Sequence, residues 1–194
     1  VNPHDRQTGN SLMAANGKKS TDIMHTFCAD GETLNVVIET PRGSRNKFSF
    51  DPERAAFRLK SVLPAGASFP YDFGFLPDTM AADGDPLDVL VLMDESAFPG
   101  CIVPARLIGV IEAKQTERGK SRRNDRLVAV ATDAHDYQDI HTLRDVNANL
   151  LKELEHFFIS YNEMRGKQFK LIGTRGPKHA KKLIAKAIKA GQKR

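Results

Sequence analysis

The chain has 194 residues, of which 40% are hydrophobic and 27% charged, as is typical of one globular domain rather than a disordered chain. No apolar run approaches the roughly 20 residues of a membrane-spanning helix, and residues 1–22 lack the apolar stretch of a secretory signal peptide. Cys28 and Cys101 form no CxxC pair, which argues against a disulfide scaffold or zinc ribbon. We therefore expect a reducing, cytoplasmic location.

The net charge of +5 is unevenly distributed along the chain. Residues 165–194 contain 11 Lys and Arg and no Asp or Glu, so the other 164 residues carry 18 basic and 24 acidic side chains. A uniformly basic nucleic-acid-binding protein is not expected to divide in this way. Between Ser61 and Ala105 there are six Asp and one Glu but no Lys or Arg. Such carboxylates repel one another, and a metal ion, distant basic residues or water must compensate them.

The first half of the chain predicts a polar arm, three strands and a long loop. Residues 1–22 show no periodicity, and we expect a mobile arm there. Alternating apolar side chains predict strands over 34–38 and 47–50, and a third strand is expected over 56–62. Residues 64–86 contain seven Pro and Gly, which predicts a long loop, and long loops in compact domains are usually functional.

The second half predicts further strands and then helices. Apolar runs predict strands over 89–92, 101–113 and 127–131, with a short one over 168–172. An apolar stripe from Leu150 to Tyr161 predicts a helix, with Asn147 as the N-cap candidate and Gly166 as the C-cap candidate. Pro177 is expected to begin a final helix with a lysine-rich polar face.

This order of elements indicates the α+β class, mainly β, as a small barrel or sheet with helices packed on one side. We expect the mobile arm over 1–22, a barrel domain over 23–175, and a basic C-terminal helix over 176–194 that packs on or extends that domain. The helix lysines are expected to be solvated.

The segment Asp83-Gly84-Asp85-Pro86-Leu87-Asp88 is the strongest chemical signal. Three carboxylates on a turn restricted by glycine and proline suit a hard cation such as Mg²⁺, which takes oxygen ligands and keeps waters for an anionic substrate. An EF-hand is excluded because its ligand spacing and its final Glu are missing. An Asp-rich β-turn without a ligand is the alternative.

This segment, together with Phe69-Pro70-Tyr71-Asp72-Phe73-Gly74-Phe75 before it and Val89-Leu90-Val91 after it, resembles the signature of family I soluble inorganic pyrophosphatases. The resemblance extends over about residues 32–173. It includes Val36-Val37-Ile38-Glu39-Thr40-Pro41, Leu127-Val128-Ala129-Val130, and His156-Phe157-Phe158 with Tyr161.

The resemblance implies a five-stranded barrel of the oligonucleotide/oligosaccharide-binding (OB) type with flanking helices, and Mg²⁺-dependent hydrolysis of pyrophosphate to two phosphates. It also implies a homo-oligomer, a hexamer or a dimer. Asp85 would position and deprotonate the attacking water. The implied metal ligands are Asp83, Asp85, Asp88 and Glu39, with Glu117 and Asp125 as candidates from a second loop. The implied phosphate contacts are Lys47, Lys60, Arg126 and Tyr161.

The sequence also departs from the family pattern. Ser49 stands where the family has Glu, and Ser61 stands where it has Arg, with Lys60 beside it as a substitute. Phe69 and Phe73 replace two tyrosines. Asn124 occupies the position of an Asp, and Asn162 the position of a Lys. The second loop is basic, and Arg118, Lys120, Arg122 and Arg123 are candidates to replace lost phosphate contacts.

Three functions follow from these observations. The first is the pyrophosphatase itself. The second is an altered family member that acts on another phosphoanhydride or binds metal-phosphate without turnover. The third is an OB-type module that binds single-stranded nucleic acid through its basic C-terminal helix, and it is disfavoured because the acidic segment would repel a nucleic-acid backbone. No membrane partner is expected.

Overall fold

A computed structural model of the chain describes residues 25–193. The arm expected over residues 1–22 lies outside this range. The elements in chain order are β1 (Leu34–Thr40), β2 (Asn46–Asp51), β3 (Ala56–Val62), β4 (Asp72–Leu76), β5 (Leu87–Leu92), β6 (Ile102–Glu117), β7 (Lys120–Arg123), β8 (Arg126–Ala131), α1 (Ala148–Glu163), β9 (Gln168–Arg175) and α2 (Pro177–Gly191).

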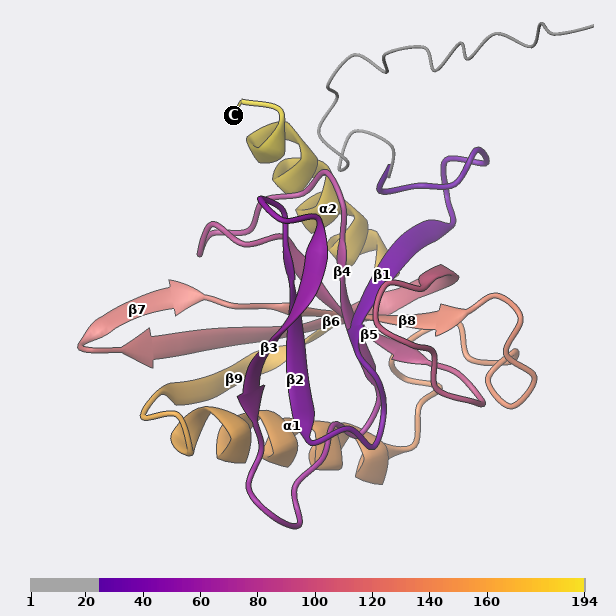
Figure 1. The fold of residues 1–194 in the computed structure, drawn as a ribbon. Coiled ribbons are helices and arrows are strands. Elements are labelled where there is room, and N and C mark those ends of the chain that lie inside the picture. The colour runs from indigo at the N-terminus through magenta and orange to yellow at the C-terminus, as the bar shows by residue number, and fades with distance from the viewer. Residues whose placement is uncertain (1–24, 194) are drawn as a thin grey trace, which may run out of the picture.

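Five of the strands close into a barrel (Figure 1). The hydrogen-bonded order is β1-β4-β5-β8-β6, and β6 pairs back onto β1, with Leu34 opposite Ala105. The β5–β8 pairing is parallel, and the other four pairings of the ring are antiparallel. The predicted α+β class and five-stranded barrel are thereby confirmed.

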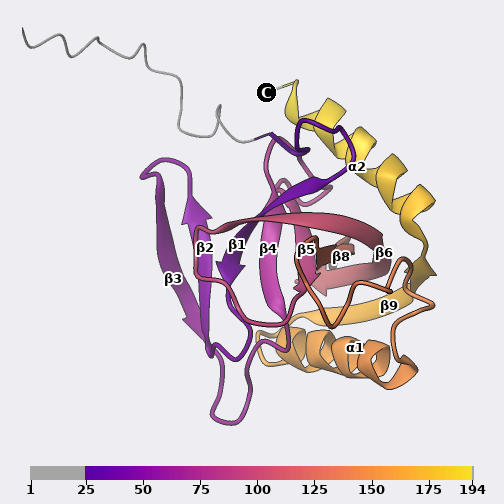
Figure 2. The same ribbon diagram turned by 90° about the vertical axis from the view of Figure 1, so that its right-hand side faces the viewer.

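The remaining elements are attached to this ring. The end of β6 extends past the barrel and pairs with β7 and β9. Strands β2 and β3 form a separate hairpin beside the barrel, and the helices lie apart from each other, with α1 packed on β9 and α2 on β6 (Figure 2). Within residues 25–193, neither helix is long and apolar enough to cross a membrane.

The apolar runs of the sequence become barrel strands that are buried on both faces. Every residue of β4 and β8 is buried, as are five of the six in β5. The two helices close the core with Leu154 and Ile184, which are fully buried. Asn147 caps α1 by accepting a hydrogen bond from the amide of Asn149, and Pro177 begins α2, as predicted.

Three expectations about the elements need correction. The segment 64–86 is not one loop, because it contains β4. Gly74 lies in that strand because a Cβ there would stand 2.1 Å from the carbonyl oxygen of Val37 in β1. Strand β7 was not predicted, since all four of its residues are exposed and polar. The C-cap of α1 is Met164, and Gly166, with a φ of +69°, follows two residues later.

Candidate active site

A large cleft of about 1490 Å³ opens at one end of the barrel. Its walls come from the β2–β3 hairpin, the turn before β5, the extended β6–β7 hairpin and the end of α1. Nine of the ten residues predicted as site residues line this cleft: Glu39, Lys47, Lys60, Asp83, Asp85, Asp88, Glu117, Arg126 and Tyr161. The tenth, Asp125, does not.

The acidic wall is formed by the turn that leads into β5. Gly84 has a φ of +94°, and the amide of Asp85 donates to the Asp83 carboxylate at 3.3 Å, which holds the turn together. Asp88 is the second residue of β5, so the strand fixes its position. Burial raises the pKa of Asp83, and the neighbouring charges of Asp88 and Asp85 raise it further. The three carboxylates therefore face the same space and repel one another.

Glu39 approaches the same space from β1. It is only 8% exposed, and its carboxylate accepts a hydrogen bond of 2.7 Å from the amide of Phe50 in β2. Burial raises the pKa of Glu39, and the charge of Lys47 acts in the opposite direction. This contact also joins the separate β2–β3 hairpin to the barrel beside the cleft.

Lys47 is a half-buried cation at the base of the hairpin. Its Nζ lies 4.3 Å from the centroid of the Phe73 ring and 5.5 Å from that of Phe69. Burial lowers the pKa of Lys47, and the negative charges of Asp88 and Glu39 oppose this effect. The two phenylalanines that replace tyrosines thus present aromatic faces to the ammonium group, an arrangement that attracts a cation without neutralising it.

Arg126, the first residue of β8, lies at the floor of the cleft with its side chain 7% exposed. Its Nη1 lies 2.6 Å from the Asp88 carboxylate and also donates to the side chain of Asn124. Its Nε is buried and has no hydrogen-bond partner within residues 25–193. A buried, unsatisfied donor is costly, and an oxygen of a phosphate or of a water in the cleft would satisfy it.

Two further predicted residues reach the cleft from α1 and from the end of β6. Burial raises the pKa of the Tyr161 hydroxyl, which accepts a hydrogen bond of 2.8 Å from Arg165. Glu117, at the end of β6, pairs with Lys167 at 3.1 Å. Three exposed cations of the β6–β7 hairpin and its turn line the same cleft: Arg118, Lys120 and Arg122. The candidate phosphate contacts thus line the same cleft as the carboxylates.

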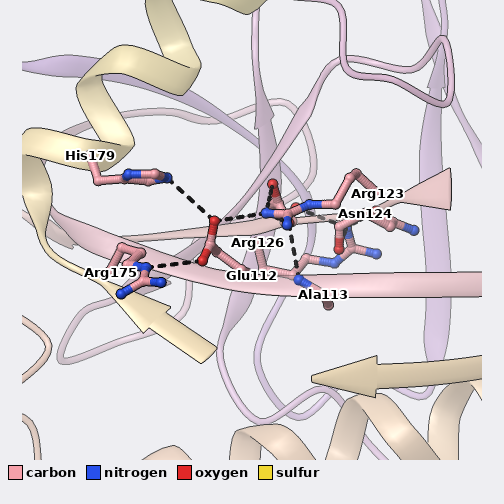
Figure 3. Close-up of polar contacts among 8 residues, drawn as sticks. Glu112, Ala113, Arg123, Asn124, Arg126, Arg175 and His179 are labelled. Atoms are coloured by element: carbon pink, nitrogen blue, oxygen red, sulfur yellow. Dashed lines mark hydrogen bonds and ion pairs between the residues drawn. The ribbon is translucent and has the colours of Figure 1, made fainter. Parts of the chain in front are cut away.

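Asp125 is directed away from the cleft. Its carboxylate accepts a hydrogen bond of 3.0 Å from the amide of Ala113 and pairs with Arg123. Figure 3 shows Arg123 also reaching Glu112, which faces Arg175 and His179. Neighbouring residues of an extended chain point in opposite directions, so Asn124 lines the cleft and Asp125 does not. Its prediction as a metal ligand is therefore not supported by its position.

Arg165 lines the cleft and is not among the site residues predicted from the sequence. It follows α1 and reaches back to Tyr161 and across to Ser61 on β3. The sequence offered one signal, since Arg165 lies four residues after Tyr161 and such side chains are neighbours on a helix.

The donor set is compatible with a divalent cation. Asp83, Asp85, Asp88 and Glu39 supply only oxygen atoms, which suits a hard ion. Among residues 25–193, no three acidic, His or Cys side chains are already gathered closely enough to enclose an ion. Mg²⁺ fits such an open arrangement, because it keeps several waters and takes only one or two carboxylates together with substrate phosphates.

Comparisons with known proteins match most of the chain. A family profile described as inorganic pyrophosphatase matches residues 36–192. An inorganic pyrophosphatase of a Nostoc species is 39% identical over 157 residues, which cover 81% of this chain and 90% of that protein. The crystal structure of an inorganic pyrophosphatase from Thermus thermophilus superposes with a TM-score of 0.80 at 32% identity, over 87% of this chain and 97% of that one. A Neisseria gonorrhoeae inorganic pyrophosphatase gives a TM-score of 0.79, also at 32% identity, over 89% and 98%.

Proposed function

This chain belongs to the inorganic pyrophosphatase family, and we propose that it hydrolyses inorganic pyrophosphate to two phosphate ions with Mg²⁺ as the cofactor. The observation that carries the proposal is the cleft itself, which is lined by both carboxylates and cations. Pyrophosphate is small and highly charged, so binding it requires cations on its outer oxygens, while hydrolysis requires a nucleophilic water at one phosphorus.

Asp83, Asp88 and Glu39 would hold the metal, and the position of Glu117 at the cleft wall supports it as a further ligand. A bound Mg²⁺ would supply charge neutralisation on the phosphate oxygens and acidify the attacking water. Asp85 is exposed at the tip of the turn and accepts the proton of that water as the P–O bond forms. The bridging oxygen leaves with the second phosphate.

The cationic side of the cleft binds the substrate. Lys47 lies over the Phe73 ring, and the buried Nε of Arg126 has no hydrogen-bond partner among the residues that the structure describes. Lys60 and the Tyr161 hydroxyl complete the contacts to the outer phosphate oxygens. Pyrophosphate bound in this cleft would be surrounded by both the carboxylates of the turn and these basic side chains.

The proposal is tested by measuring phosphate release from pyrophosphate with Mg²⁺ and with EDTA. We expect release with Mg²⁺, none with EDTA, and a loss of about 10²- to 10⁴-fold in kcat for Asp85→Asn, since removing a general base typically costs this much. Asp139→Asn is the matched control, because Asp139 is exposed and outside the cleft. A folded protein that releases no phosphate would overturn the proposal and favour the altered-substrate or binding-only alternatives.

Two further expectations accompany this function. Self-association is proposed from the family resemblance and is supported by Phe98 and Ile102, whose side chains are large, apolar and 68% and 45% exposed. A cytoplasmic location is proposed on the ground that Cys28 and Cys101 are both free thiols.

A further inference from the structure

Arg165 is fixed at the rim of the cleft by two elements that are distant in sequence. Its Nη1 donates to the Tyr161 hydroxyl at 2.8 Å and to the Ser61 hydroxyl at 3.1 Å. Its guanidinium carbon also lies 5.3 Å from the centroid of the Tyr161 ring. Ser61 belongs to β3 and is 104 positions away in the chain, so the guanidinium bridges the end of α1 to the β2–β3 hairpin across the cleft.

The charge of Arg165 is not neutralised by these contacts. Both of its partners are hydroxyl groups, and among residues 25–193 no carboxylate lies within 4.0 Å of its guanidinium nitrogens. The neighbouring cations differ in this respect, because Arg126 pairs with Asp88 at 2.6 Å and Lys167 pairs with Glu117 at 3.1 Å. A guanidinium that is oriented by neutral groups is preorganised to bind an anion with its remaining donors.

The position also matches a departure of this sequence from the family pattern. Ser61 stands where the pattern has an arginine, and the guanidinium of Arg165 lies against that serine. Asn162, which stands in place of a lysine, is buried and donates to the carbonyl oxygen of Phe158, so it does not supply the missing charge. The cation that β3 lacks is thus supplied from the end of α1.

We infer that Arg165 is a substrate-binding residue whose guanidinium contacts an outer phosphate oxygen of pyrophosphate, with Ser61 and Tyr161 as its positioning residues. This inference rests on the proposed function, because the bound anion is taken to be the pyrophosphate that the cleft hydrolyses. The serine at position 61 leaves room for a guanidinium that approaches from the other wall.

The test measures kcat and KM for pyrophosphate with Mg²⁺ in Arg165→Gln. Loss of a charge-assisted hydrogen bond to phosphate is expected to raise KM by roughly 10-fold or more. Arg144→Gln is the matched control, since it removes the same charge from an exposed arginine outside the cleft, and its KM should equal that of the unmodified protein. Arg165→Lys, which keeps the charge but not the planar fork, should give an intermediate KM.

A second variant separates a binding role from a structural one. Ser61→Arg, introduced into Arg165→Gln, returns a guanidinium to the same place from β3, and it should lower KM again by several-fold. A purely structural bridge would not be restored by this exchange. Isothermal titration with methylenediphosphonate, which has no hydrolysable P–O–P bond, should show the same order of affinities.

The outcomes distinguish a failure of the proposed function from a failure of the inference about Arg165. If the unmodified protein releases no phosphate from pyrophosphate, the proposed function fails. If it is active and Arg165→Gln matches it in both KM and methylenediphosphonate affinity, the inference about Arg165 is overturned while the proposed function stands. The inference is also overturned if KM rises in Arg165→Gln and Ser61→Arg gives no recovery.

Discussion

The carboxylate of Glu112 connects four elements on the outside of the barrel, and its neutralisation gives a measurable prediction. Glu112 lies in β6 and is 7% exposed. Its oxygens lie 2.8 Å from Arg123 of β7, 3.2 Å from Arg175 of β9 and 3.3 Å from His179 of α2 (Figure 3). Glu112→Gln keeps the shape of the side chain and removes the charge that holds these cations.

The expected loss of stability is about 1–2 kcal/mol. A hydrogen bond to a charged group contributes roughly 1.5–3 kcal/mol, and a neutral one about 1 kcal/mol. The substitution Glu112→Gln replaces two charge-assisted hydrogen bonds, those with Arg123 and Arg175, by weaker contacts. The side chains of Arg123 and Arg175 are 43% and 62% exposed, so water compensates part of the loss.

The effect should depend on pH in one direction. Burial alone would raise the pKa of Glu112, but Arg123, Arg175 and His179 hold this pKa below its ordinary value of 4.5. A carboxyl whose pKa falls on folding stabilises the protein above its unfolded pKa and loses this contribution as the pH drops through its folded pKa. The difference between Glu112→Gln and the unmodified protein should therefore be full at pH 7 and should shrink below about pH 4.5.

The assay is urea unfolding followed by far-UV circular dichroism at a fixed protein concentration, because the chain has no Trp for fluorescence. Glu32→Gln is the control: its carboxylate is 80% exposed and 3.9 Å from Lys181, so we expect a change under about 0.5 kcal/mol. Equal urea midpoints at pH 7 for Glu112→Gln and the unmodified protein, or a difference that persists unchanged at pH 3, would refute the reasoning.

Two other predictions concern the barrel and the cleft. Gly74→Ala should destabilise the fold by more than about 3 kcal/mol, because its Cβ would lie 2.1 Å from a backbone oxygen of β1; Gly173→Ala, with open space around it, should be near neutral, and equal urea midpoints for the two would contradict this account. Burial lowers the pKa of Lys47, so KM for pyrophosphate should rise at a lower pH than for an ordinary lysine. Lys47→Arg should move that rise to higher pH, and an identical alkaline limb in both proteins would argue against Lys47 as a phosphate contact.

The sequence predicted the elements whose own side chains decide their structure. The apolar run of β5, the Asn147 cap of α1 and the proline that begins α2 are local signals, and the structure agrees with all three. Strand β4 gave no alternating pattern because all five of its residues are buried. Gly74 in this strand resembled a loop glycine, although the close approach of β1 is what requires a glycine there. Strand β7 is exposed along its length and exists only as the partner of β6.

The candidate site also contains residues that local sequence could predict and residues that it could not. The carboxylates of the turn before β5 are close together in sequence, so their shared position in the cleft could be predicted. Asp125 could not be placed, because a shift of one residue in an extended segment turns a side chain to the opposite direction. The position of the Arg165 side chain depends on its hydrogen bond to Ser61, and no local sequence pattern relates two residues that are 104 positions apart.

The closure of the barrel by β1 and β6 has a consequence for how the chain refolds. Residues 34–37 must find residues 102–105, and contacts between such distant segments make folding slow because a long loop is ordered before the contact is gained. The β2–β3 and β6–β7 hairpins need only nearby residues and can form early. Glu39 on β1, Asp88 on β5 and Arg126 on β8 come together only after β1 has paired with β4 and β5 with β8, so a refolding chain gains most of its hairpin structure before it gains a substrate cleft.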